Sequence, residues 1–320
     1  MAELRAGQRL TGDRAEGPAR RVAGSETVAR WLGRVPVRFR RAVPFGPRGD
    51  LRRRLAGRHP WELGYDLEAP PTDGLPVGPP DFIGVGASLC GGGWWYGMVA
   101  AHPGVADRAG RPVGLHYFSH FCTRAFTTED GTRYHRWFPR PPGQLTGEWT
   151  AGYSAEPWVA PLLAEAAPEA RLLYMVRDPV ERFRLGLDRI AESRVPNVGA
   201  AVADVVDRGF YAVQLRRLLE FVPRERILVL QLEQCWRDPA GQLAATDRFL
   251  GLDTDRRPPS VATAPPRLPP AAPIDPSVTE RLTDLYATDV VDLAALVPSL
   301  DLDLWPTAGG SGGPGRARGR

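Results

Sequence analysis

Lysine is absent from this sequence of 320 residues, so all 41 basic side chains are arginines. The absence extends over the whole chain, and we attribute it to codon bias rather than to the needs of one site. It nevertheless constrains function, because any chemistry that normally uses a lysine ammonium must here use a guanidinium.

Cysteine and long apolar runs are also scarce. The three cysteines, Cys90, Cys122 and Cys235, are too few and too scattered for a disulfide framework or a zinc site, so we expect reduced structural thiols and no bound metal. No apolar run approaches the ~20 residues that span a bilayer, and the N-terminus lacks the continuous apolar segment of a secretory signal. These absences predict a cytoplasmic protein without a transmembrane segment.

Charge is distributed unevenly along the chain. Residues 1–60 contain 15 arginines and five acids, whereas residues 61–320 contain 26 arginines and 32 acids. The simplest interpretation of residues 1–60 is a partly disordered, Arg-rich arm on an acidic body. Because apolar side chains are interspersed among the arginines, contact with an anionic membrane surface or nucleic acid is the alternative. A Pro/Gly linker at 61–80, a domain at 81–306 and a flexible Gly/Arg tail at 307–320 complete the predicted organisation.

Short apolar segments alternate with amphipathic ones through the predicted domain. We expect strands at residues 82–86, 113–118, 170–176 and 226–233. We expect helices at residues 94–101, 156–167, 179–190, 204–222, 239–250 and 276–296. This alternation predicts an α/β fold, a three-layer sandwich with a central, mostly parallel sheet.

A glycine loop follows the first expected strand. Three consecutive glycines, Gly91, Gly92 and Gly93, separate that strand from the helix expected to begin at Trp94. Glycines allow backbone N–H groups to close on an anion, and a helix N-terminus adds free donors and a positive dipole. The segment therefore predicts a phosphate cradle. Between Cys90 and Trp94, however, it contains no Lys, Arg, Ser or Thr to assist the backbone.

Several separated motifs, in consistent order, resemble a bacterial sulfotransferase of the branch related to heparan-sulfate sulfotransferases. They are DFIGVGA with the glycine loop and WWYG, HPGV, LHYF, RWFPRPPGQLTGEWT, RLLYMVRDPVERFRLGL, FYAVQLRRLLEFVPRERILVLQLEQCWRDPAGQLAATDRFLGLD and LDLDLWP. The resemblance covers about residues 79–306. It implies a P-loop-kinase-like fold and 3′-phosphoadenosine-5′-phosphosulfate as the sulfuryl donor.

The resemblance also implies a nucleotide-binding set. The loop positions Ser88, Leu89, Cys90, Gly91, Gly92, Gly93 and Trp94 match the family's 5′-phosphosulfate loop. Leu89 stands where that family has a basic residue, and Gly92 and Gly93 stand where it has hydroxyl side chains. In the 3′-phosphate motif Arg177 is retained, whereas the serine position is Leu185. The alternative for Arg177 is a structural ion pair with Asp178 or Glu181.

The catalytic base of the family is replaced as well. The Lys-Glu pair that precedes its His-aromatic-aromatic strand corresponds to Val113 and Gly114. His116 can serve as a base near neutral pH, although a hydrogen-bonded core histidine is the alternative. Glu148 matches an acid near the family's cleft, and a turn-capping role is the alternative. His120 is expected at the surface, and Tyr211 either packs in the core or lines the acceptor cleft.

Three hypotheses for function follow. The first is a sulfotransferase that uses the nucleotide co-substrate and a hydroxyl or amine acceptor. The second is a catalytically impaired homologue that binds a nucleotide or another ligand, or serves a partner protein, since the groups expected at Leu89, Gly92, Gly93 and Gly114 are missing. The third makes the Arg-rich arm the functional part, through contact with an anionic surface.

Overall fold

A computed structural model describes residues 68–106, 114–122, 124–192, 197–256 and 273–307 of the chain. Its centre is a four-stranded, fully parallel sheet in the order β2-β1-β3-β4. The strands are β1 (Phe82–Gly86), β2 (Gly147–Trp149), β3 (Arg171–Val176) and β4 (Ile227–Gln231). Their near-continuous apolar sequences are typical of strands that helices cover on both faces.

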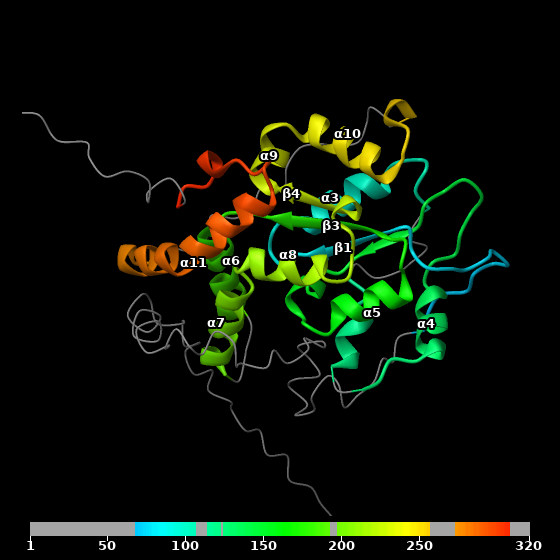
Figure 1. Ribbon diagram of the computed structural model, residues 1–320, viewed down its shortest axis with the longest axis horizontal. Helices are drawn as coiled ribbons and strands as arrows, with labels where there is room; N and C mark the ends of the chain where they lie inside the picture. Colours follow the sequence, from blue (N-terminus) through cyan, green and yellow to red (C-terminus); the bar gives the residue numbers. More distant parts are fainter. Residues whose placement is uncertain (1–67, 107–113, 123, 193–196, 257–272, 308–320) are drawn as a thin grey trace, which may run out of the picture.

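Helices form the outer layers. They are α3 (Gly92–Ala100), α4 (Thr128–His135), α5 (Val159–Ala166), α6 (Pro179–Glu192), α7 (Val198–Asp207), α8 (Tyr211–Leu219), α9 (Leu232–Arg237), α10 (Pro239–Leu250) and α11 (Pro276–Leu296). Helices α3, α9 and α10 cover one face of the sheet, and α5 and α8 cover the other (Figure 1). The predicted three-layer α/β sandwich is therefore confirmed. None of the helices in these described ranges is long and apolar enough to cross a membrane.

A second apolar cluster lies beyond the carboxyl ends of the strands. There α6, α7 and α11 pack around Val180, Phe183, Val205, Leu282 and Tyr286. Figure 1 shows α6 and α11 at the end of the sheet toward which the strand arrows point.

Most predicted elements are confirmed, but the strand at 113–118 is wrong. Gly114 and His116 have left-handed φ angles of 80° and 51°, which interrupt an extended strand. A 3₁₀ helix, Phe118–Phe121, follows them. The fourth position in the sheet belongs instead to β2, a three-residue edge strand whose sequence, Gly-Glu-Trp, carries too little apolar pattern to be recognised.

The helix expected at 204–222 is two helices. Chain direction changes at Gly209, between α7 and α8, where an added Cβ would lie 2.6 Å from the Tyr286 ring. The strand expected at 226–233 ends at Gln231, and its last two positions begin α9. The predicted Arg-rich arm, residues 61–67 of the linker and residues 308–320 of the tail lie outside the described residues. Those segments and the domain limits stay predictions.

Candidate functional site

The candidate site is the region beyond the carboxyl ends of β1 and β3. The chain passes from β1 to β2 on one side and then crosses to β3 on the other, so strand order reverses at β1. In open parallel sheets, ligands bind at such a switch point, because the two loops leave in opposite directions. The glycine loop follows β1 and Arg177 follows β3, so the fold brings together the two predicted phosphate-binding segments.

Left-handed backbone angles shape the glycine loop. Leu89 has φ 67° and Gly91 has φ 86°, and α3 begins directly afterwards at Gly92. A Cβ on Gly91 would lie 2.6 Å from Leu232 Cδ1, so both the backbone angle and the space require glycine there. Among the described residues, the amides of Leu89, Gly91, Gly92 and Gly93 donate to no protein acceptor. They can therefore bind an anion at a helix N-terminus.

The two glycines at the hydroxyl positions have opposite surroundings. A Cβ on Gly92 would lie 2.2 Å from Trp149 Nε1, whereas a Cβ on Gly93 would meet nothing within 4 Å. The Trp149 indole, which also packs against Gly84, thus fills the space of a side chain at 92. Nothing in the sequence connects GEWT with the glycine loop, because only the parallel pairing of β1 and β2 brings them together.

The side chains of Ser88, Cys90 and Trp94 are buried or partly buried. Ser88 Oγ donates to the Ala151 carbonyl at 2.9 Å, which ties the loop to the chain after β2. Cys90 is fully buried, and burial raises the pKa of its thiol to about 11. The Trp94 ring is partly buried and packs edge-on against Trp95, with centroids 5.3 Å apart. These contacts orient the loop.

Arg177 combines burial with unused hydrogen-bonding capacity. The residue is 6% exposed, and neither Nε nor Nη1 has an acceptor within the described parts of the chain. Its guanidinium lies over the Trp236 ring, 5.6 Å from the centroid. Two buried N–H groups without an acceptor are unfavourable unless a ligand supplies one.

The predicted ion pair of Arg177 with Asp178 or Glu181 is not formed, although the charge of Arg177 acts on the Glu233 carboxylate and opposes the rise that burial gives its pKa. The Asp178 carboxylate accepts from the amides of Val180 and Glu181 at the start of α6 and from Thr307, while Glu181 pairs with Arg184 at 2.7 Å. No described carboxylate lies within 4.0 Å of the Arg177 guanidinium. Leu185, on α6, is partly buried and supplies no donor.

Arg208 is a site residue that sequence reasoning missed. It follows α7, is 2% exposed, and its Nη1 donates to Ser88 Oγ at 3.4 Å. Its Nε contacts the Asp204 carboxylate at 3.1 Å, and burial lowers the pKa of the guanidinium. No local pattern marks this arginine, because 120 positions separate it from Ser88.

His116 lies beside the position of the missing base. A Cβ on Gly114 would be 3.3 Å from His116 Nε2, so the imidazole occupies the space next to that position. The His116 amide donates to Thr150 Oγ1 at 3.3 Å. The left-handed φ of His116 turns its side chain away from the direction that a regular strand would give it.

Glu148 is buried in β2. Its Oε1 accepts from the Tyr134 hydroxyl and its Oε2 from Thr150 Oγ1, both at 2.6 Å. Burial raises the pKa of this carboxyl, and the hydrogen bonds from Thr150 and Tyr134 oppose that rise. Because Thr150 also accepts the His116 amide, Glu148 supports the backbone of His116. A catalytic role for Glu148 stays a prediction.

Two further expectations concern single residues. His120 is 6% exposed, so its expected surface position is wrong; the 3₁₀ helix packs it against the body. Tyr211 is fully buried, with its hydroxyl 3.5 Å from Cys90 Sγ, which is core packing. In the part of the chain that the structure describes, no group of three or more His, Cys, Asp or Glu side chains could hold a metal ion.

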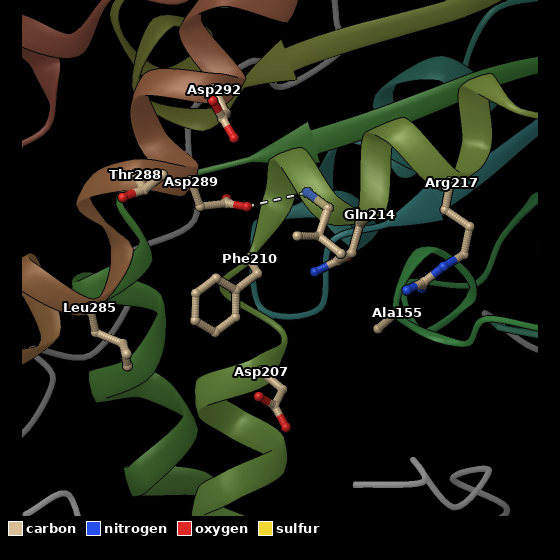
Figure 2. Close-up of a pocket in the computed structure, with 10 residues that line it drawn as sticks. Ala155, Asp207, Phe210, Gln214, Arg217, Leu285, Thr288, Asp289 and Asp292 are labelled. Carbon is tan, nitrogen blue, oxygen red and sulfur yellow. Dashed lines mark hydrogen bonds between the residues drawn. The ribbon is translucent and has the colours of Figure 1, made fainter. Parts of the chain in front are cut away.

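A cavity of about 480 Å³ lies between α7, α8 and α11. Asp207 and Phe210 line it at one end and Arg217 at the other (Figure 2). Figure 2 also shows Asp289 directed at the start of α8, where its oxygens accept from the amides of Ala212 and Val213 at 3.0 and 3.2 Å. None of the predicted site residues lines the cavity.

Comparison with known proteins gives similarities of sequence and of structure. No family model matches the chain. Heparan sulfate glucosamine 3-O-sulfotransferases 3B1 and 3A1 of Homo sapiens are each 28% identical to it over 171 residues, which is 48% of this chain. The match covers 42% and 40% of those proteins, so the chain spans about two fifths of their length. The crystal structure of a sulfotransferase from Alicyclobacillus acidocaldarius is 25% identical, with a TM-score of 0.59, and the match covers 71% of this chain and 99% of that one.

Proposed function

We propose that this chain, which belongs to the sulfotransferase family, transfers a sulfuryl group from 3′-phosphoadenosine-5′-phosphosulfate to a hydroxyl or amine acceptor. In this reaction the bond between sulfur and the 5′-phosphate oxygen breaks, a bond from sulfur to the acceptor atom forms, and the acceptor loses a proton. The protein must hold a polyanionic nucleotide, stabilise charge on the leaving phosphate and accept the proton.

The observation that carries this proposal is the buried Arg177 guanidinium. It lies at the carboxyl end of β3, its Nε and Nη1 have no acceptor among the described residues, and the free amides of the glycine loop follow the neighbouring strand. One cation and several N–H donors at a strand-order switch suit a ligand with two separate phosphate groups. We assign the 3′-phosphate to Arg177 and the 5′-phosphosulfate to the loop backbone from Leu89 to Gly93.

We assign the missing loop cation to Arg208. Its contact with Ser88 Oγ brings a guanidinium to the start of the loop, although from α7 rather than from position 89. An arginine can neutralise developing phosphate charge as a lysine does. We assign the role of base to His116, which lies beside the position of the missing glutamate and accepts the proton from the acceptor.

Nucleotide titration of the full chain tests the binding half of the proposal. Wild-type protein is expected to bind adenosine 3′,5′-bisphosphate more tightly than adenosine 3′-monophosphate or adenosine 5′-monophosphate. Arg177→Met should weaken the bisphosphate and the 3′-monophosphate ~10–100-fold and leave the 5′-monophosphate unchanged, because a hydrogen bond to a charged group is lost. Arg208→Met should show the reverse selectivity.

Arg216→Met is the matched control. Arg216 is an exposed arginine on α8. Its Nη1 lies 2.9 Å from Asp292 Oδ2 of α11. Its substitution should leave all three affinities unchanged. Absence of binding to any of the nucleotides by wild-type protein would rule out the proposed function.

Transfer of labelled sulfate then separates an active enzyme from the second candidate, a nucleotide-binding homologue without turnover. That candidate is favoured by one specific observation: Leu89, Gly92, Gly93 and Gly114 replace the side chains that the family's chemistry uses. The names of the two human relatives specify a glucosamine 3-hydroxyl, so heparan sulfate is the first acceptor to test. Binding without transfer to any hydroxyl or amine acceptor would favour the second candidate.

A further inference from the structure

The chain after β2 brings a buried carboxylate to the side of His116. A Cβ on Gly152 would lie 3.4 Å from Glu156 Oε1 and 3.8 Å from His116 Nδ1. The two side chains therefore approach the same point from separate segments of the chain, and no hydrogen bond joins His116 Nδ1 to the carboxylate. Glu156 is only 1% exposed, so its charge acts in a poorly solvated environment.

Arginine stabilises the charge of Glu156. The negative charge of Glu156 raises the pKa of the Arg208 guanidinium, against the effect of burial. Arg208 in turn contacts Ser88 Oγ and the Asp204 carboxylate. The glycine loop thus contacts Arg208, and the charge of Arg208 acts on the carboxylate beside His116 without a hydrogen bond between them.

The other polar groups near His116 contact or influence different parts of the protein. Glu148 acts on its backbone, through Thr150 Oγ1. The Cys122 thiol feels the Glu156 charge, which adds to the effect of burial in raising its pKa. His120 belongs to the 3₁₀ helix that follows His116, and Asp204 and Asp207 surround Arg208. Among these groups, Glu156 is the acid that faces the same glycine as the imidazole ring.

We infer that Glu156 is the positioning residue for His116, so that the two form a carboxylate–imidazole pair which replaces the single glutamate missing at Gly114. The inference rests on the proposed function and deepens it. His116 takes the proton from the acceptor and becomes an imidazolium, and the negative charge of the nearby Glu156 carboxylate stabilises that cation. The proton stays on His116, while the sulfuryl group moves from the nucleotide to the acceptor oxygen or nitrogen.

Proton NMR titration of the histidine rings tests this pair without any need for turnover. Glu156→Gln should lower the pKa of His116 by about one unit, because a nearby negative charge favours the imidazolium. His102 and His135 serve as internal reporters and should titrate as in wild type. The His116 resonance is assigned by its disappearance in His116→Gln.

Two further variants keep the test decisive. Glu165→Gln removes an exposed acid of α5 and should leave His116 unchanged. Glu156→Asp retains the charge and should keep the pKa of His116 closer to the wild-type value than Glu156→Gln does. An equal His116 pKa in wild type and Glu156→Gln overturns the inference, whether or not the protein binds nucleotide.

Activity supplies a second readout if the proposed function holds. The acidic limb of the pH profile of kcat/KM should move to lower pH in Glu156→Gln, together with the His116 titration. A uniform loss of rate at every pH would indicate a structural role and contradict the inference. Failure of the proposed function is recognised separately, as a wild-type protein that binds no adenosine nucleotide.

Discussion

At the scale of single residues, two adjacent glycines of the glycine loop differ in the space around them. A neighbouring side chain fills the space at one position, and the space at the other is empty. The Trp149 indole fills the space beside Gly92, whereas Gly93 is exposed with no neighbour near its missing Cβ. Reintroducing a hydroxyl is therefore sterically possible at only one of these two positions. Restoring an acid at Gly114 would meet a different obstacle, since its φ is 80° and His116 Nε2 lies 3.3 Å from the Cβ position.

We predict that Gly93→Thr folds with wild-type stability and binds adenosine 3′,5′-bisphosphate more tightly, because it adds a donor at the helix N-terminus. Gly92→Thr, its matched control, should lose about 1–3 kcal/mol of unfolding free energy, because its side chain overlaps the indole. Denaturant unfolding and nucleotide titration check both variants. Equal stability of the two proteins would contradict this account of Trp149.

At the scale of elements, helices with strong local signals lie where the sequence predicts them. The helix α10 begins after Asp238, which accepts from the Gly241 amide, with Pro239 in its first turn, and it ends at Gly251 in the left-handed region. The helix α11 begins in the same way after Asp275. Capping residues and a terminal glycine act within a few positions of one another, so sequence alone is sufficient to predict these boundaries.

Packing between elements gives glycines within helices opposite roles. Gly186 in α6 is buried, and a Cβ there would lie 2.3 Å from Val205 Cγ1 in α7. Gly97 in α3 is exposed, with nothing within 4 Å of its Cβ position. The first glycine permits close helix contact, whereas the second only lowers helix propensity.

We therefore predict that Gly186→Ala destabilises the protein by about 1–3 kcal/mol, because α6 and α7 must separate. Gly97→Ala should stabilise it by about 0.5–1 kcal/mol, because alanine is the better helix former. Chemical denaturation measures both changes. Destabilisation by Gly97→Ala would show that α3 packs more tightly than described.

At the scale of the whole molecule, a P-loop-kinase-like α/β fold gathers charge at one end of its sheet. Arg177 follows β3 and Arg208 follows α7. The carboxylates of Asp204 and Asp207 lie near Arg208. Burial raises the pKa of Asp207 to about 6, although the charges of Arg208 and Arg182 oppose that rise. The folded protein thus holds a proton on Asp207 more tightly than the unfolded chain does.

The raised pKa of Asp207 makes the stability of the protein depend on pH. Between about pH 4 and pH 6 the folded state binds more protons than the unfolded state, so the contribution of Asp207 to stability falls as the pH rises. We predict that Asp207→Asn is more stable than wild type by roughly 1–3 kcal/mol at pH 7–8, with no such gain at pH 4. Thermal or denaturant unfolding across this range provides the measurement.

The exposed Asp284 of α11 provides the control for that prediction. Asp284→Asn should change stability little at either pH, because its carboxyl is solvated in both states. A gain that is the same at pH 4 and pH 8 for Asp207→Asn would contradict the titration argument and indicate a packing effect instead.

The candidate site was only partly predictable. The glycine loop, Arg177 and His116 stand in contiguous motifs, so sequence could identify them. Trp149, Arg208 and Glu156 escaped because each lies near a residue distant in sequence: Gly92, Ser88 and His116 respectively. The wrong strand at 113–118 has a related cause, since the left-handed angles of Gly114 and His116 depend on the chain after β2 that packs against them.

The sequence by itself determined the α/β class, most helix boundaries, the family resemblance and the absence of lysine at any site, because these depend on composition and on patterns within a few turns. Only the tertiary structure decided which side chains lie beside the glycine loop and beside His116. Parallel pairing of β1 with β2 brings Trp149 to Gly92, the end of α7 brings Arg208 to Ser88, and the loop after β2 brings Glu156 to His116. Such contacts join residues tens of positions apart, and no local periodicity encodes them.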